Sequence, residues 1–140
     1  MSKKMVVFGI TSASGGIENL MHYFLLDCIK KSLFDEIIIA SSYATIAFED
    51  EYKRNNIDVI HISSWKNRSA YKKDINSIIN RLNQNDLLYL NLSSYCNWEL
   101  LSCVKKANCK IIIHAHNAHV GNPIKKVIHA IGKKRFNKVG

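Results

Sequence analysis

Short apolar runs alternate along the chain with longer segments whose apolar side chains recur at helical spacing. Five runs are typical of buried β-strands: residues 5–10, 36–41, 57–62, 87–92 and 109–115. Helices are predicted between and after them: residues 17–29, 43–55, 70–82, 97–106 and a last helix that begins at Asn122-Pro123. Asn caps a helix N-terminus well and Pro fits its first turn, which supports that last start.

This alternation predicts an α/β fold. Strands that are apolar throughout are buried on both faces, which is typical of a parallel sheet covered by helices. We therefore expect a Rossmann-like, doubly wound parallel sheet of about five strands, in a single domain. Ligands of such sheets bind beyond the carboxyl ends of the strands, so the loops that follow the strands are expected to form the site.

The net positive charge arises from one end of the chain. The 140 residues carry a net charge of +9, yet residues 1–99 hold 11 basic and 11 acidic side chains. Residues 100–140 hold nine basic side chains and no acidic one. Such a field attracts phosphates, nucleic acid or an acidic membrane surface. Four lysines of this region flank the apolar stripe of the last helix, which either lies on an anionic membrane or packs on the sheet: Lys125, Lys126, Lys133 and Lys134.

Composition excludes several classes of protein. Hydrophobic residues make up 47% of the chain and charged residues 22%, which is typical of a globular domain. No apolar run approaches the roughly 18 residues of a membrane span, and the first residues do not resemble a secretory signal. The four cysteines form no C-x-x-C pair and are expected to be small buried residues in a reducing cytoplasm.

The loop after the first strand is rich in small residues. Gly15 and Gly16 allow backbone N–H groups to approach an anion at a helix N-terminus, for which a diphosphate is the natural ligand. The same pair is also compatible with a tight turn and no ligand. A P-loop nucleotidase is excluded because no Lys follows the glycines, and a short-chain dehydrogenase because no Tyr begins Y-x-x-x-K.

Histidines cluster at the end of the fifth strand. His114 and His116 lie on one side of that strand, and Asn117 and His119 follow them. These groups could hydrogen-bond a polar substrate, bind a metal, or serve only the structure. No carboxylate follows Glu99, so no metal is expected, and the absence of G-x-S-x-G excludes a serine hydrolase of that type.

Aromatic side chains follow two further strands. Trp65 lies beside Lys66 and Arg68 after the third strand, and Tyr95 comes shortly before Trp98 after the fourth. Such segments can stack on a sugar or a base, or they can be ordinary solvated loops.

In this order the motifs resemble the N-terminal half of a GT-B glycosyltransferase of family 4, of the type that builds capsular or exopolysaccharide. Residues 14–19 (SGGIEN) are similar to the family's S-G-G-x-E loop, and residues 114–117 (HAHN) to its H-x-H-N stretch. Between them, residues 92–95 (LSSY) match the Ser/Tyr-rich loop that follows the fourth strand.

The resemblance implies a role for each matched position. Gly15 and Gly16 would face the diphosphate of a nucleotide-sugar donor, and His116 would be the catalytic-site residue beside the reacting sugar. Glu18 and Asn117 would shape the acceptor side, to which we add Trp65 and Tyr95 as stacking residues. The family transfers sugar with retention and without a metal cofactor, to a polysaccharide or a lipid-linked acceptor. The expected location is the cytoplasm, where the basic end could contact the inner face of the membrane.

The chain also departs from the family. Its members contain a second Rossmann-like domain, with paired glutamates eight positions apart, that binds most of the donor. No two glutamates here have that spacing. Residues 1–140 are therefore expected to be the acceptor-side domain without the C-terminal donor domain, inactive alone. The alternative is a non-catalytic Rossmann-like module that binds a nucleotide or a protein partner. Nucleic acid is not an expected partner, because no RNA-recognition aromatic motif accompanies the basic end.

Overall fold

The structure of the chain, a computed structural model, describes residues 2–92, 97–116, 126, 127, 130, 131 and 134. Over this part of the chain, strands and helices alternate as predicted: β1 (Lys4–Phe8), α1 (Gly16–Lys30), β2 (Glu36–Ser41), α2 (Glu49–Arg54), β3 (Asp58–His61), α3 (Arg68–Ile79), β4 (Leu87–Leu92), α4 (Trp98–Val104) and β5 (Lys110–Ala115). The expected order of β and α elements is therefore confirmed.

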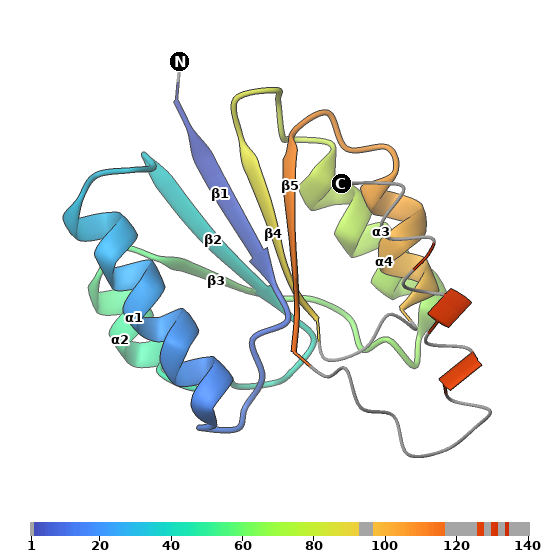
Figure 1. The fold of residues 1–140 in the computed structure, drawn as a ribbon, viewed down its shortest axis with the longest axis horizontal. Helices are drawn as coiled ribbons and strands as arrows, with labels where there is room; N and C mark the ends of the chain where they lie inside the picture. Colours follow the sequence, from blue (N-terminus) through green and yellow to red (C-terminus); the bar gives the residue numbers. More distant parts are fainter. Residues whose placement is uncertain (1, 93–96, 117–125, 128–129, 132–133, 135–140) are drawn as a thin grey trace.

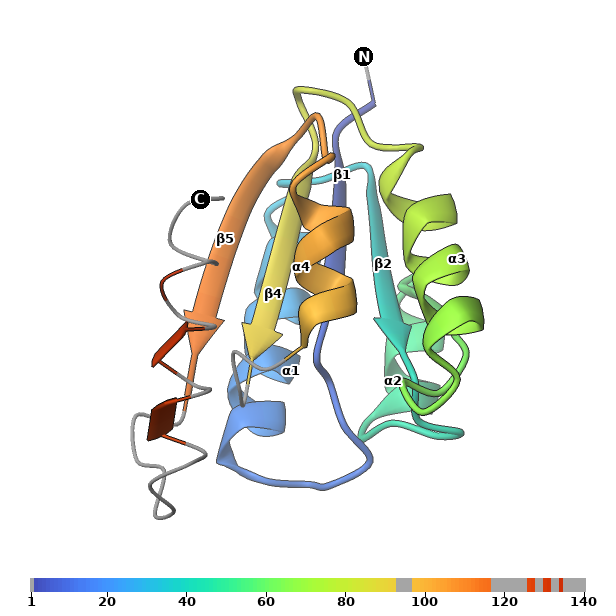
Figure 2. The same cartoon turned by 90° about the vertical axis from the view of Figure 1, so that its right-hand side faces the viewer.

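The strands form one parallel sheet in the order β3-β2-β1-β4-β5. Helices α1 and α2 cover one face and α3 and α4 the other, as Figures 1 and 2 show from two directions. The predicted doubly wound, Rossmann-like sheet is thus confirmed. The strand order reverses between β1 and β4, and a sheet of this type binds ligands outside the carboxyl ends of the strands at such a reversal.

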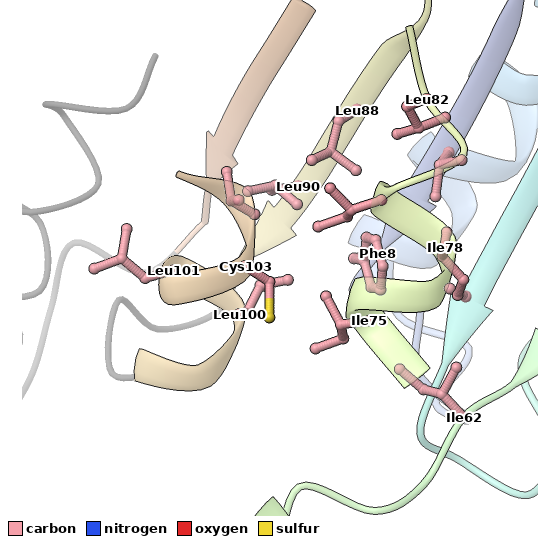
Figure 3. Packing of buried hydrophobic residues seen from close by; sticks show 14 of the residues in the cluster. Phe8, Ile62, Ile75, Ile78, Leu82, Leu88, Leu90, Leu100, Leu101 and Cys103 are labelled. Carbon is pink, nitrogen blue, oxygen red and sulfur yellow. The ribbon is translucent and has the colours of Figure 1, made fainter. Parts of the chain in front are cut away.

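Each face of the sheet has its own buried hydrophobic cluster. The cluster under α3 and α4, drawn in Figure 3, joins strand residues to helix residues: Phe8, Leu88, Leu90, Ile75, Ile78, Leu100 and Cys103. The cluster under α1 and α2 does the same: Val7, Ile39, Met21, Leu25, Cys28 and Tyr52. A large apolar side chain stabilises a fold by roughly 1.5–3 kcal/mol when it is fully buried, so these two clusters hold the layers together.

Two predicted boundaries are wrong for identifiable reasons. The first strand ends at Phe8 and not at residue 10, because Gly9 turns the chain with a φ of +95°. The helix expected over residues 43–55 begins only at Glu49. Phe48, just before it, has a φ of +62°, and the Glu49 carboxylate accepts a hydrogen bond from the backbone N–H of Ile46. The segment before Glu49 is therefore a loop that follows β2.

The predicted last helix is described only in part. Lys126, Val127, Ala130, Ile131 and Lys134 are helical and exposed. Val127 is 60% exposed and Ile131 45%, so neither packs into the two clusters. Four residues assigned a role from the sequence lie outside the described part: Tyr95, Asn117, Lys125 and Lys133. No helix among the described residues is both long and apolar enough to cross a membrane.

Gly9 provides a test of how tightly β1 and β4 pack. A Cβ at this position would lie 1.7 Å from the backbone oxygen of Asn91, and the φ of +95° already disfavours other residues. We expect Gly9→Ala to lower the free energy of unfolding by about 3 kcal/mol or more in urea denaturation.

Gly16→Ala is the matched control, because nothing lies within 4 Å of an added Cβ at Gly16. Its free energy of unfolding should stay within about 1 kcal/mol of the wild type. Equal effects of the two substitutions would contradict the packing described here.

Candidate functional site

A cavity of about 510 Å³ opens at the carboxyl edge of the sheet, where the strand arrowheads of Figure 1 meet. Among the described residues, its walls come from residues at or after the end of each strand and from the first turns of α1, α3 and α4. The polar and aromatic described residues that line it are Phe8, Thr11, Glu18, Ser41, Ser42, Tyr43, Trp65, Tyr71, Asn91, Asn97, Glu99 and His116. The cavity therefore lies at the reversal of strand order between β1 and β4.

Asn91 fixes one wall of this cavity. It lies near the end of β4 and is only 4% exposed. Its side-chain Nδ2 donates to the backbone oxygen of Gly9 at 3.1 Å, and its Oδ1 accepts from Nε2 of His116. Because a carbonyl oxygen can only accept, His116 carries its proton on Nε2. Nδ1 is then the acceptor nitrogen of the ring.

The charge state of His116 follows from its surroundings. Burial lowers the pKa of His116 below the ordinary histidine value, and the neighbouring His114 lowers it further. The ring centroids of the two histidines are 4.1 Å apart, whereas Glu18 acts in the opposite direction on the pKa. His116 is thus a neutral group at pH 7 that can accept a hydrogen bond from a ligand hydroxyl.

Glu18 supplies a buried carboxylate to the cavity wall. It lies in the first turn of α1, is 7% exposed, and accepts a hydrogen bond from Thr11 Oγ1 at 2.5 Å. A negative charge is favourable at a helix N-terminus. A Cβ on Gly15 would lie 3.0 Å from the second carboxylate oxygen, so the glycine leaves room for this side chain. Gly15 therefore has a packing role beside Glu18, in addition to the diphosphate binding predicted for it.

The loop after β2 forms the wall that contains Tyr43. Ser41 Oγ donates to the backbone oxygen of Ile10 at 2.9 Å and accepts from the backbone N–H of Tyr43. His61, at the end of β3, lies 2.7 Å from the Tyr43 backbone oxygen through Nδ1 and 3.0 Å from Glu49 Oε1 through Nε2. Both partners are acceptors, so this geometry favours a doubly protonated ring.

The remaining wall lies between α3 and α4. Asn97 Nδ2 donates to the hydroxyl of Tyr71 at 2.7 Å, and Glu99 forms an ion pair with Arg68. Trp65 is 63% exposed and contributes an aromatic surface. Among the described residues that line the cavity, two carry carboxylates and none is Lys or Arg.

The structure brings together three of the residues predicted from the sequence: Glu18, Trp65 and His116 all line the cavity. Gly15 and Gly16 do not line it, and Gly16 is exposed at the start of α1. Their assignment to a diphosphate stays a prediction, for a site outside the cavity. Lys126 and Lys134 are exposed. Among the described residues, no group of three or more His, Cys, Asp or Glu side chains is placed to hold a metal ion.

Sequence reasoning missed several of the lining residues. Ser41 and Asn91 are buried polar residues at the ends of apolar strands, and this position alone could have marked them. Thr11 and Glu99 carried no comparable signal, because their partners are recognised only once the chain is folded. Asn97 caps α4, where its side chain accepts from the backbone N–H of Leu100.

Comparison with solved structures gives a fold likeness. The chain is similar to the crystal structure of the C-terminal domain of a hydrogenase from Pyrococcus furiosus, with a TM-score of 0.52. The two are 8% identical, and the match covers 81% of this chain and 91% of that domain. At this identity the likeness concerns the fold alone. No family model and no curated protein matches the sequence.

The hydrogen bonds of His61 with the Tyr43 backbone and with Glu49 predict that the stability of the fold depends on pH. The hydrogen bonds to Glu49 and to the Tyr43 backbone raise the pKa of His61, while those from Lys53 and His61 lower the pKa of Glu49 to about 2. Since the folded pKa of His61 exceeds the unfolded one, its contribution to stability is fully present below about pH 6.5 and is lost as the pH rises through the raised pKa.

Glu49→Gln should therefore bring the His61 pKa back toward about 6.5, measured by NMR titration of the ring. Asp50→Asn removes a neighbouring exposed carboxylate that has no contact with His61 and should leave the titration unchanged. A His61 pKa that is the same in wild type and Glu49→Gln would rule out the interaction between His61 and Glu49.

Proposed function

We propose that this chain is the acceptor-side domain of a retaining glycosyltransferase, and that its cavity binds the saccharide that accepts the transferred sugar. One observation carries the proposal. Glu18, from the S-G-G-x-E-like loop, and His116, from the H-x-H-N-like stretch, line the same cavity although they are far apart in the sequence. The resemblance in sequence therefore concerns residues that meet in space.

The chemistry of the cavity supports a saccharide as ligand. Sugar hydroxyls donate and accept, and the walls offer the Glu18 and Glu99 carboxylates, the acceptor nitrogen of His116 and the hydroxyls of Ser41 and Ser42. Sugar rings also present apolar C–H faces, which pack on exposed aromatic rings such as those of Trp65 and Tyr43. Few polar groups and several aromatic ones, in a concave site, are typical of small-molecule binding.

In this proposal the domain acts by positioning the acceptor. Neutral His116, held by Asn91, accepts from one hydroxyl, and buried Glu18, held by Thr11, accepts from another. Fixing a nucleophilic hydroxyl beside a reacting carbon lowers the entropic part of the barrier. The donor diphosphate predicted at Gly15 and Gly16 would lie at the exposed start of α1, outside the cavity.

The alternative, a non-catalytic module that binds a nucleotide, has less support from the cavity walls. Nucleotide phosphates are normally held by Lys, Arg or a ring of backbone N–H groups. The described residues around the cavity include no Lys or Arg and two carboxylates. A nucleotide bound here would place its phosphates beside like charge.

Saccharide binding can be measured on the chain itself. In Trp98→Phe, Trp65 is the single tryptophan and reports on the cavity. We expect at least one of a panel of methyl hexopyranosides to change Trp65 fluorescence in a saturable way. Introducing His116→Ala into this variant should weaken binding by about tenfold, the usual effect of losing one hydrogen bond of about 1.4 kcal/mol.

Tyr23→Ala is the control, since Tyr23 is an exposed aromatic residue of α1 that does not line the cavity. It should leave the affinity unchanged. The proposal fails if no hexoside binds while a nucleoside diphosphate does, because that result favours the nucleotide-binding module.

A second prediction concerns catalysis by a transferase that contains this domain. His116→Ala should lower kcat by about 10²-fold or more, the usual scale for losing a group that acts in the transition state. Steady-state kinetics with Tyr23→Ala as control would measure this. An unchanged kcat would remove His116 from the site.

A further inference from the structure

A second recess adjoins the cavity on the outer side of α3 and α4. It is a groove of about 360 Å³, lined by Arg68, Ser69, Lys72, Trp98, Glu99 and Ser102, and we refer to it as the α3–α4 groove. Glu99 lines both the groove and the cavity. The two recesses therefore adjoin at Glu99.

The cavity and the α3–α4 groove differ in the charge of the described residues that line them. The described residues of the cavity wall carry the Glu18 and Glu99 carboxylates and no Lys or Arg, whereas the groove contains both Arg68 and Lys72. Glu99 neutralises one of these two cations through its ion pair with Arg68. The groove thus keeps a net positive charge beside an acidic cavity, which favours an anion in the groove and a neutral group in the cavity.

The two cations retain hydrogen-bond donors for a ligand. Arg68 Nε donates to Glu99 Oε1 at 2.5 Å, but a guanidinium has five N–H groups, and its side chain is 76% exposed. Lys72 is exposed on α3, and no carboxylate in the described part of the chain forms an ion pair with it. An oxyanion in the groove could therefore accept charge-assisted hydrogen bonds from both side chains.

We propose that the saccharide bound in the cavity carries an anionic substituent, a phosphate or a carboxylate, that binds in the α3–α4 groove to Arg68 and Lys72. The inference depends on the proposed function, because it assumes that a sugar occupies the cavity. It makes the acceptor an acidic saccharide whose neutral ring and charged group are bound in separate recesses. Glu99 lies where the cavity and the α3–α4 groove adjoin. There its carboxylate disfavours an anion in the cavity, and its ion pair with Arg68 holds the guanidinium at the groove.

The two tryptophans allow each recess to be observed separately. Trp65→Phe leaves Trp98 as the reporter of the groove, and Trp98→Phe leaves Trp65 as the reporter of the cavity. The probes are a methyl hexoside, the matching hexose 1-phosphate and the matching hexuronate. We expect the methyl hexoside to change Trp65 fluorescence only. At least one acidic probe should change the fluorescence of both tryptophans and bind about tenfold more tightly.

Lys72→Gln tests the contact, and Lys73→Gln is the matched control. Both residues are exposed on α3 and lose the same charge, but Lys73 does not line the groove. Lys72→Gln should weaken binding of the acidic probe about fivefold and leave the methyl hexoside unaffected. Lys73→Gln should change neither affinity. The acidic probe that responds identifies the substituent as phosphate or carboxylate.

The possible failures are distinguishable. If no probe, neutral or acidic, changes Trp65 fluorescence, the saccharide function and this inference fall together. If the methyl hexoside binds but the acidic probes bind no more tightly, the α3–α4 groove is not an anion site and only this inference is overturned. The same holds if Lys72→Gln and Lys73→Gln weaken the acidic probe equally, since that is a long-range charge effect.

Discussion

The close approach of β1 and β4 at Gly9 and Asn91 is the constraint on which the site depends. The backbone oxygen of Asn91 occupies the space where any other residue at position 9 would place its Cβ. This contact lets the Asn91 side chain reach the Gly9 backbone oxygen with one end and His116 with the other. One buried amide thereby connects β1, β4 and β5 at the point where the strand order reverses, and it also sets the tautomer of His116.

Similar hydrogen bonds fix the other polar groups at this edge. Ser41 binds the Ile10 backbone, Thr11 binds Glu18, and the Tyr89 hydroxyl lies 2.8 Å from Nδ1 of His114. A buried polar group that is fully hydrogen-bonded has few alternative positions, because leaving its partner costs about 1–3 kcal/mol. The side chains around the cavity are thus oriented before any ligand arrives, which reduces the entropy lost on binding.

The fold was predictable because its signal is periodic. Apolar runs and helical stripes identified every strand and helix among the described residues, and strands that are apolar throughout indicated a parallel sheet, although no residue of the edge strands β3 and β5 is fully buried. Local conformation was harder to predict. Residues 43–48 have a composition compatible with a helix, but Phe48 adopts a positive φ, and the Ala47 N–H binds the Thr11 backbone, 36 positions earlier. Such long-range contacts cannot be recognised from the spacing of apolar residues along a short segment.

The site was predictable where a residue follows a strand and carries a distinctive side chain. Trp65 and His116 satisfied both conditions, whereas Glu18, which like Glu99 is a glutamate of a first helical turn, was predicted only through the S-G-G-x-E-like loop; all three line the cavity. Asn91 and Glu99 did not, since an amide at a strand end and a glutamate in a first helical turn have many ordinary uses. Their roles depend on partners from distant segments, Gly9 and His116 for the first and Arg68 for the second.

The distribution of charge separates two kinds of binding surface. Like charges about 4 Å apart repel by roughly 4 kcal/mol at an effective dielectric of about 20, which is close to a thousandfold in affinity. A phosphate inside the cavity would meet this repulsion from the Glu18 carboxylate, whereas a neutral sugar ring would not. Two basic side chains, Arg68 and Lys72, line the α3–α4 groove instead. The cavity walls would therefore favour an uncharged ring over a phosphate because they hold a carboxylate and, among the described residues, no Lys or Arg, and not only because of the hydrogen bonds that they offer.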